Sequence, residues 1–279
     1  MAAASSRSIK RRLLASKLSI FGLLIVLILV ITGVFAPYLA PYDPNEMMFE
    51  YVYHSPSQDF LLGTDALGRD VLSRVVWGAR TSLFVGIGAT VVALLVGVTF
   101  GGLAGFYGKI TSQVFMRLAD VQLSIPSLIL LIVAAAVLGE RNMPVIVAII
   151  GITMWPTLGR VTRSKVLDLK TRDYVEAAKI AGASNTRILW RHIMPNGLGP
   201  ITVIATLDIG SAIIMESSLS FLGLGDPRMI SWGNMLSTGL QDMIPAPWMA
   251  VFPGFAIFFT VWGLNMFGDA LRDALDVEA

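Results

Sequence analysis

Long runs of apolar residues alternate with short polar stretches along this chain, and six of the runs approach the length of a membrane-spanning helix. A helix needs about 20 mostly apolar residues to cross the hydrocarbon core of a bilayer. The pattern therefore predicts an all-α integral membrane protein with six transmembrane helices. The predicted spans are Leu18–Ala36, Thr81–Tyr107, Val121–Leu138, Pro144–Leu158, Pro200–Leu224 and Trp248–Phe267.

Two of these runs need comment. The first follows a basic stretch, Arg7 to Arg12, as in a signal peptide. It is longer than the typical apolar region of about 7 to 15 residues, and Pro37 and Pro41 stand where they would hinder cleavage, so we expect a retained helix. The fourth run is short and contains Pro156, which predicts a kink.

The composition agrees with lipid as the main solvent. Of the 279 residues 55% are apolar and 14% are charged, against about 25% charged in soluble domains, and the mean hydropathy is +0.71. Cysteine is absent, which excludes disulfides and cysteine-ligated metals. The two histidines, His54 and His192, are far apart in sequence and offer no metal-binding spacing.

The positions of Lys and Arg predict the orientation. If the N-terminus is cytoplasmic, sixteen of these residues fall in cytoplasmic segments and five on the other side. Because cytoplasmic loops carry the excess of positive charge, both termini are expected in the cytoplasm. The expected parts are a cytoplasmic N-terminal segment (1–17), the first helix with an extracytoplasmic loop (18–80), and a transmembrane core (81–279) containing a cytoplasmic loop (160–199).

A short amphipathic helix is expected inside this cytoplasmic loop. Tyr174, Ala177, Ala178 and Ala181 recur at helical spacing and form one weakly apolar face beside Glu176. Small side chains suit a helix that lies in a groove of a partner protein. The alternative is an amphipathic loop helix that simply faces solvent.

The residues that follow predict a turn and a second helix. Gly182 can end the first helix in the left-handed conformation without the steric penalty of a Cβ atom. Ser184 or Asn185 can cap a helix from Thr186 to Ile193, which Pro195 is expected to end. The two helices would make a rigid, angled pair.

Small residues recur at every fourth position of the second span, at Ala89, Ala93, Gly97, Gly101 and Gly105. Such a ridge lets another helix approach closely in lipid. The neighbour is either a helix of the same bundle or one of a partner protein.

The segment before that span has its own signature, from Leu62 to Asp70. Apolar residues after Asp70 alternate with arginines, which predicts a short amphipathic helix lying in the membrane interface, with Trp77 as an anchor.

Several strings in order along the chain resemble the permease subunits of bacterial ABC importers, in particular the C-type subunit of the dipeptide and oligopeptide branch. They run from residue 60 to the C-terminus. The matching strings are Leu62–Asp70, the Glu176 loop with Gly182 and Pro195, Glu216–Gly225, Ser231–Leu236 and Asn265–Asp273.

This resemblance implies a type I ABC importer permease fold in the bacterial plasma (inner) membrane. It implies one half of a translocation path for short peptides, with nickel, glutathione or another small solute as the alternative cargo. The implied partners are a second, homologous permease, two ATP-binding cassette ATPase subunits or domains and an extracytoplasmic binding protein. The coupling residues implied for contact with the ATPase are Tyr174, Glu176, Ala177, Ala178, Gly182 and Pro195.

No enzymatic site is expected in the chain. The stretch Gly102–Ile110 superficially resembles a phosphate-binding loop, but Leu103 replaces a required glycine and Ile110 replaces the Ser or Thr that would hold Mg²⁺. ATP is therefore expected on partner subunits, and no cofactor is expected on this chain.

Two acids interrupt the fifth span, Asp208 and Glu216. Charged groups in a membrane usually face protein or water, so these acids either line a substrate path or bond to a neighbouring helix. They would also suit a secondary transporter driven by an ion gradient. That rival needs inverted repeats, which the sequence does not display, and it leaves the Glu176 loop unexplained. A second rival is a membrane scaffold without transport activity.

Overall fold

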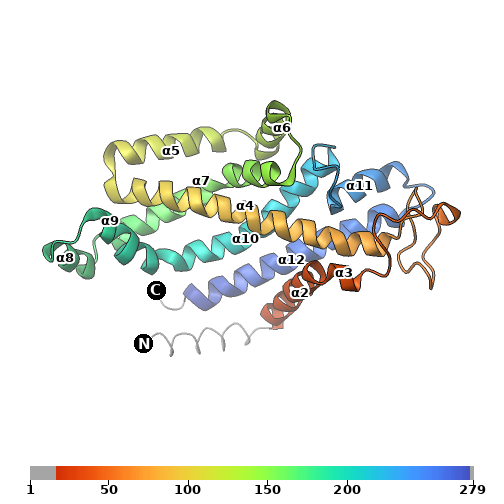
Figure 1. The fold of residues 1–279 in the computed structure, drawn as a ribbon. Coiled ribbons are helices and arrows are strands. Elements are labelled where there is room, and N and C mark those ends of the chain that lie inside the picture. The colour runs from red at the N-terminus through yellow and green to blue at the C-terminus, as the bar shows by residue number, and fades with distance from the viewer. Residues whose placement is uncertain (1–16, 277–279) are drawn as a thin grey trace.

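The computed structural model describes residues 17–276 as a bundle of helices (Figure 1). Strand pairing in this range is limited to an isolated bridge between Thr64 and Asp70. The basic stretch Arg7 to Arg12 lies outside the described residues. In chain order the elements are α2 (Lys17–Val34), α3 (Ala36–Leu39), η1 (Phe49–Tyr51), α4 (Val71–Tyr107), α5 (Lys109–Leu123), α6 (Ser127–Leu138), α7 (Met143–Leu169), α8 (Asp173–Ile180), α9 (Asn185–Arg187), η2 (Ile188–Ile193), α10 (Met194–Phe221), α11 (Trp232–Gln241) and α12 (Trp248–Asp276).

Five helices in residues 17–276 are long and apolar enough to cross a bilayer, and the bent pair of α5 and α6 makes a sixth span if the two helices cross together. The five helices correspond to the first, second, fourth, fifth and sixth predicted spans, and most extend beyond the predicted limits. The predicted boundary between residues 80 and 81 falls inside α4. The loops expected on opposite sides of the membrane lie at opposite ends of the bundle, with α8 and the end of α12 at one end and α11 at the other (Figure 1).

The third predicted span is wrong as a single straight helix. The chain there forms the end of α5 and the separate helix α6, and the two helices are bent by 94° relative to each other. Pro126 stands at the break as the N-terminal cap of α6, with ψ 127°. A proline lacks an N–H and disfavours helical conformation in the residue before it, so α5 does not continue through this position. With 12 residues, α6 is roughly 18 Å long, which is too short to cross a core of about 30 Å.

Pro156 does not end α7, which continues through it to Leu169. A proline inside a helix leaves the carbonyl four residues earlier without its usual donor. Here the side chain of Gln122 in α5 supplies donors, since its Nε2 lies 3.0 Å from the oxygen of Ile152 and 2.7 Å from that of Thr153. Its Oε1 accepts a hydrogen bond from Nε1 of Trp155 at 2.9 Å. The proline site in α7 thus becomes the attachment point of α5.

The interfacial amphipathic helix predicted after Asp70 is also wrong, because these residues are the first turns of α4. Asp70 caps the helix by accepting a hydrogen bond from the backbone of Ser73 at 2.7 Å. Val71 and Ala79 are almost completely buried. The apolar face that suggested contact with lipid therefore packs inside the protein.

The ridge of small residues on α4 packs against α7 of the same chain. A Cβ atom built on Gly97 would lie 2.8 Å from Cβ of Leu158, and one on Gly105 would lie 2.8 Å from Cβ of Val166. At Gly101 a Cβ atom would collide with the carbonyl oxygen of Gly159. The ridge was expected to contact either a helix of the same bundle or a helix of a partner protein. The structure shows contact with a helix of the same bundle, α7.

This packing makes a stability prediction. Replacing Gly101 by alanine forces α4 and α7 apart, and overpacking of this kind costs about 1 to 3 kcal/mol. We expect a clear fall in the thermal unfolding temperature of the purified protein in detergent. The control is Gly199→Ala in α10, where a Cβ atom meets nothing within 4 Å. Equal unfolding temperatures for the two variants would contradict the close contact.

Candidate coupling and translocation site

Helix α8 is held against the base of α10 by one buried side chain. Val175 is fully buried and belongs to the same apolar cluster as Ile188 and Ile193 of η2. Acidic residues, Asp173 and Glu176, occupy the first turn of α8 and Lys179 the last, an arrangement that complements the helix dipole. The helix is therefore fixed to the segment that leads into the membrane.

The end of α8 has the geometry expected from the sequence. Gly182 has φ +79°, and its N–H donates to the carbonyl of Lys179 at 3.0 Å. The N–H of Ala183 donates to the carbonyl of Ala178 at 3.0 Å, which completes a Schellman motif. Ser184 then caps α9. The predicted glycine turn at Gly182 and the predicted cap at Ser184 are confirmed.

Pro195 does not end the second helix, and that prediction is wrong. The helix runs without a break from Asn185 to Phe221. The reason is the π-helical segment η2, in which the N–H of Met194 bonds to the carbonyl of Leu189, five residues earlier. The wider π turn shifts the hydrogen-bond register at the proline. The side chain of Asn196 also donates to the carbonyl of His192 at 2.6 Å.

The exposed face of α8 is rotated relative to the predicted one. Val175 and the half-buried Ala178 point toward the rest of the protein. Glu176, Ala177 and Ile180 point outward, and Ile180 is 89% exposed. Tyr174 lies at the flank, 40% exposed. Ile180 was not predicted as part of the contact face, because it does not fall at the helical spacing that begins at Tyr174.

The two acids of α10 do not share one surface. Glu216 is 1% exposed, and its Oε1 accepts a hydrogen bond from Oγ of Ser220 at 2.5 Å. Close by, the first turn of α11 lies on α10, since a Cβ atom on Gly233 would collide with the carbonyl oxygen of Ser217. Asp208 is half-buried, and its Oδ2 makes no hydrogen bond within the described chain. The arrangement places Glu216 inside the protein, beside helix α11.

A groove of about 500 Å³ lies on another side of α10, and no sequence pattern indicated it. Ile214, Ser218 and Phe221 of α10 form one wall, and Leu236 of α11 and Leu128 of α6 contribute to the others. The groove is mostly apolar. Oγ of Ser218 donates to the carbonyl of Ile214 at 2.8 Å, so this hydroxyl is satisfied within its own helix.

Comparison with known proteins identifies the family. Residues 97–277 match the family described as the binding-protein-dependent transport system inner membrane component, and residues 6–56 match the N-terminal TM domain of oligopeptide transport permease C. The chain belongs to this family of transport permeases. It is an integral inner membrane protein and a permease subunit of an ABC importer.

Similar relatives span nearly the whole chain. The oligopeptide transport system permease protein OppC of Bacillus subtilis is 41% identical over 95% of this chain and 87% of its own length. The dipeptide transport system permease protein DppC of Alkalihalophilus pseudofirmus is 42% identical over 95% and 88%. The glutathione transport system permease protein GsiD of Pectobacterium atrosepticum is 41% identical over 97% and 90%.

A solved structure of the MetNI methionine ABC transporter in inward-facing conformations has the same fold. Its TM-score is 0.55 at 19% sequence identity, over 73% of this chain and 96% of that chain. The permease fold expected from the sequence is therefore confirmed.

The outward face of α8 predicts which substitution separates coupling from folding. Ala177→Arg adds bulk and charge to the exposed face, so the permease should fold normally but retain its ATPase partner poorly and lose ATP-driven uptake. Ala178→Arg buries a charge against the apolar cluster and should lower the unfolding temperature as well.

The matched control is Ser164→Arg, an exposed position on α7 outside α8. It should leave ATPase retention and uptake unchanged. Normal retention and uptake in the Ala177→Arg variant would refute the assignment of this face.

Proposed function

We propose that this chain forms one half of the translocation path of an ATP-driven importer for short peptides. The observation that carries the proposal is the fixed attachment of an exposed helix, α8, to a helix that continues without a break to the groove on α10. Relatives at about the same identity are named for oligopeptide and dipeptide transport, which supports peptides as the cargo.

In this proposal the energy comes from ATPase subunits that contact the outward face of α8, with Tyr174, Glu176, Ala177 and Gly182 in the coupling segment. The stretch that superficially resembles a phosphate-binding loop supports this division of labour. Gly102 to Tyr107 lie in the last turns of α4, and Gly105 packs against Val166 of α7. A glycine that packs between two helices cannot form the open loop that cradles a phosphate.

The mechanical link runs through the π-helical segment. Val175 of α8 packs against the apolar cluster of η2, and η2 continues into α10. When the ATPase subunits close and displace α8, the cytoplasmic half of α10 must follow, because the contact is a packed core and the helix is continuous. The residues at the groove, Ser218 and Phe221, lie at the other end of the same helix.

The second candidate cargo is glutathione, which is itself a tripeptide. The observation in its favour is the relative named for glutathione transport, which is 41% identical. The second permease and the extracytoplasmic binding protein complete the proposed transporter, and the binding protein delivers the cargo.

The proposed orientation, with both termini in the cytoplasm, can be tested because the chain contains no cysteine. Single cysteines at Ser57 and Thr238 should react with an impermeant maleimide added to intact cells. A cysteine at Ser184 should react only after the membrane is opened. Labelling of Ser184 from outside would invert the topology and remove α8 from the compartment that holds ATP.

The energy source and cargo can be tested in proteoliposomes with the reconstituted partners. Accumulation of a labelled dipeptide should require ATP on the α8 side and the binding protein, and it should persist when ion gradients are dissipated. Accumulation driven by a proton or sodium gradient without nucleotide would overturn the proposal. Accumulation of glutathione but of no dipeptide would replace the proposed cargo and leave the mechanism intact.

A further inference from the structure

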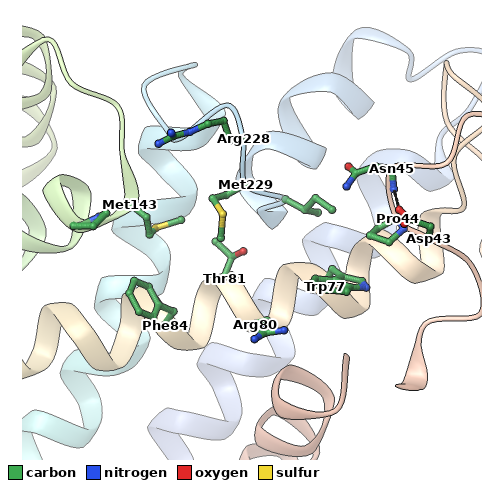
Figure 2. A pocket seen from close by; sticks show the side chains of 12 residues that line it. Asp43, Pro44, Asn45, Trp77, Arg80, Thr81, Phe84, Met143, Arg228 and Met229 are labelled. Carbon is green, nitrogen blue, oxygen red and sulfur yellow. Dashed lines mark hydrogen bonds between the residues drawn. The ribbon is translucent and has the colours of Figure 1, made fainter. Parts of the chain in front are cut away.

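A cavity of about 620 Å³ lies at the outer end of the bundle and does not share its lining with the groove on α10 (Figure 2). Its walls come from the segment after α3, the first turns of α4, the start of α7 and the loop after α10. Its volume falls in the range of roughly 300 to 1,000 Å³ that is typical of small-molecule sites.

Two opposite charges line this cavity without pairing with each other. Asp43 and Arg80 are both among its lining residues (Figure 2). No ion pair within 4.0 Å forms at either side chain among residues 17–276. Opposite charges that share a cavity and remain apart can each accept one end of a ligand that carries both signs.

The carboxylate is held in place by its own segment. Asp43 accepts a hydrogen bond from the backbone N–H of Asn45 at 2.8 Å. The segment is tied to α4 on both sides of Asp43: the N–H of Tyr42 donates to Oγ of Ser73 at 3.1 Å, and Nη1 of Arg74 donates to the carbonyl of Pro44 at 2.9 Å. These bonds fix the backbone on both sides of Asp43.

The guanidinium is also positioned. The Cζ atom of Arg80 lies 5.6 Å from the ring centroid of Trp77, one turn earlier on α4, which is within the range of a cation–π contact. Charges that are held apart before a ligand arrives need little reordering when it binds, and this preorganisation favours affinity.

The third charged lining residue, Arg228, is compensated within its own loop. Its Nε and Nη2 atoms each lie 3.1 Å from a carboxylate oxygen of Asp226, and these hydrogen bonds hold the pKa of Asp226 below its usual range. Asp226 also accepts from the backbone N–H of Met143 at 3.1 Å, which fixes the loop to the start of α7. Among the charged lining residues, Asp43 and Arg80 alone lack an ionic partner within the described chain.

The rest of the lining is largely apolar. Phe84 and Met143 stand on one side of the cavity, and Met229 reaches toward α4 from the loop (Figure 2). Methionine side chains adapt to ligands of different shape. Such a wall accepts varied apolar side chains and leaves the fixed recognition to the two charges.

We infer that this cavity is a receiving site that binds a short peptide by its two ends, with the ammonium group at Asp43 and the carboxylate at Arg80. The inference rests on the proposed peptide cargo and adds a subsite on the permease itself. A peptide with one blocked terminus leaves one of these side chains unpaired and therefore binds less tightly.

The test is direct binding of the dipeptide Ala-Phe to the assembled transporter in nanodiscs, without the binding protein. Arg80→Gln and Asp43→Asn should each weaken binding by about tenfold, the order expected for loss of one charged hydrogen bond. The matched controls are Arg141→Gln and Asp59→Asn, which remove the same charges from exposed extracytoplasmic positions outside the cavity. The controls should bind like wild type.

Blocked peptides assign each end. In the wild-type transporter N-acetyl-Ala-Phe and Ala-Phe amide should each bind about tenfold less tightly than Ala-Phe. In Asp43→Asn the acetyl group should cost no further affinity, and in Arg80→Gln the amide should cost none. A cycle of this kind isolates the contact between one side chain and one terminus, which general damage to the fold does not reproduce.

Three outcomes would overturn the inference. These are absence of Ala-Phe binding, equal affinity of both cavity variants and wild type, and displacement of Ala-Phe by glycerophosphoethanolamine, which would assign the cavity to a zwitterionic lipid headgroup. ATP-driven uptake is measured on the same preparations. If uptake persists while any of these three outcomes is found, the receiving site is refuted and the proposed function stands; if uptake is also absent, the proposed function fails.

Discussion

The rest of the structure depends on the direct backbone contact between α4 and α7. In lipid, two helices gain nothing from hiding apolar side chains, so close packing must hold them together. Gly97, Gly101 and Gly105 let α7 approach until no Cβ atom fits between the two backbones. The pair forms the centre of the bundle. Helix α10 packs against α4 at Gly86, and α5 is attached to α7 through Gln122.

Proline sites show where the sequence predicts the fold and where it cannot. Pro126 breaks the third predicted span, and the side chain that donates at this break, Ser124, bonds to the carbonyl of Val121 in its own ending helix. Pro156 and Pro195 lie in helices that continue. At Pro156 the side chain of Gln122 donates to the carbonyl of Ile152, which the proline leaves without its usual donor. At Pro195 a π turn changes the hydrogen-bond register, and the side chain of Asn196 donates to the carbonyl of His192. Whether a proline ends a helix thus depends on a distant side chain or on a change of hydrogen-bond register. Apolar periodicity reveals neither, although it predicted the positions of five spans and the all-helical fold.

The candidate site shows the same division between local and tertiary information. The glycine turn at Gly182 was predictable, since a left-handed cap depends on local backbone geometry alone. The outward face of α8 was not, because its rotation is set by Val175, which packs against residues of η2. Likewise, the sequence placed Asp208 and Glu216 in the same span but could not show what surrounds each of them. The position of α11 decides that Glu216 is enclosed while Asp208 stays half-buried.

The groove on α10 and the outer cavity differ in how many polar groups they offer to a peptide. A path must let cargo enter and leave, so no group along it should bind tightly. On the groove of α10 the hydroxyl of Ser218 bonds within its own helix, and the neighbouring side chains are apolar, so little remains to hold a peptide. At the outer cavity the opposite holds, because Asp43 and Arg80 keep their charges unpaired. In the proposed transporter, recognition of the peptide would be concentrated at the outer cavity, and the groove deeper in the bundle would offer few groups to retain the peptide once it has left that cavity.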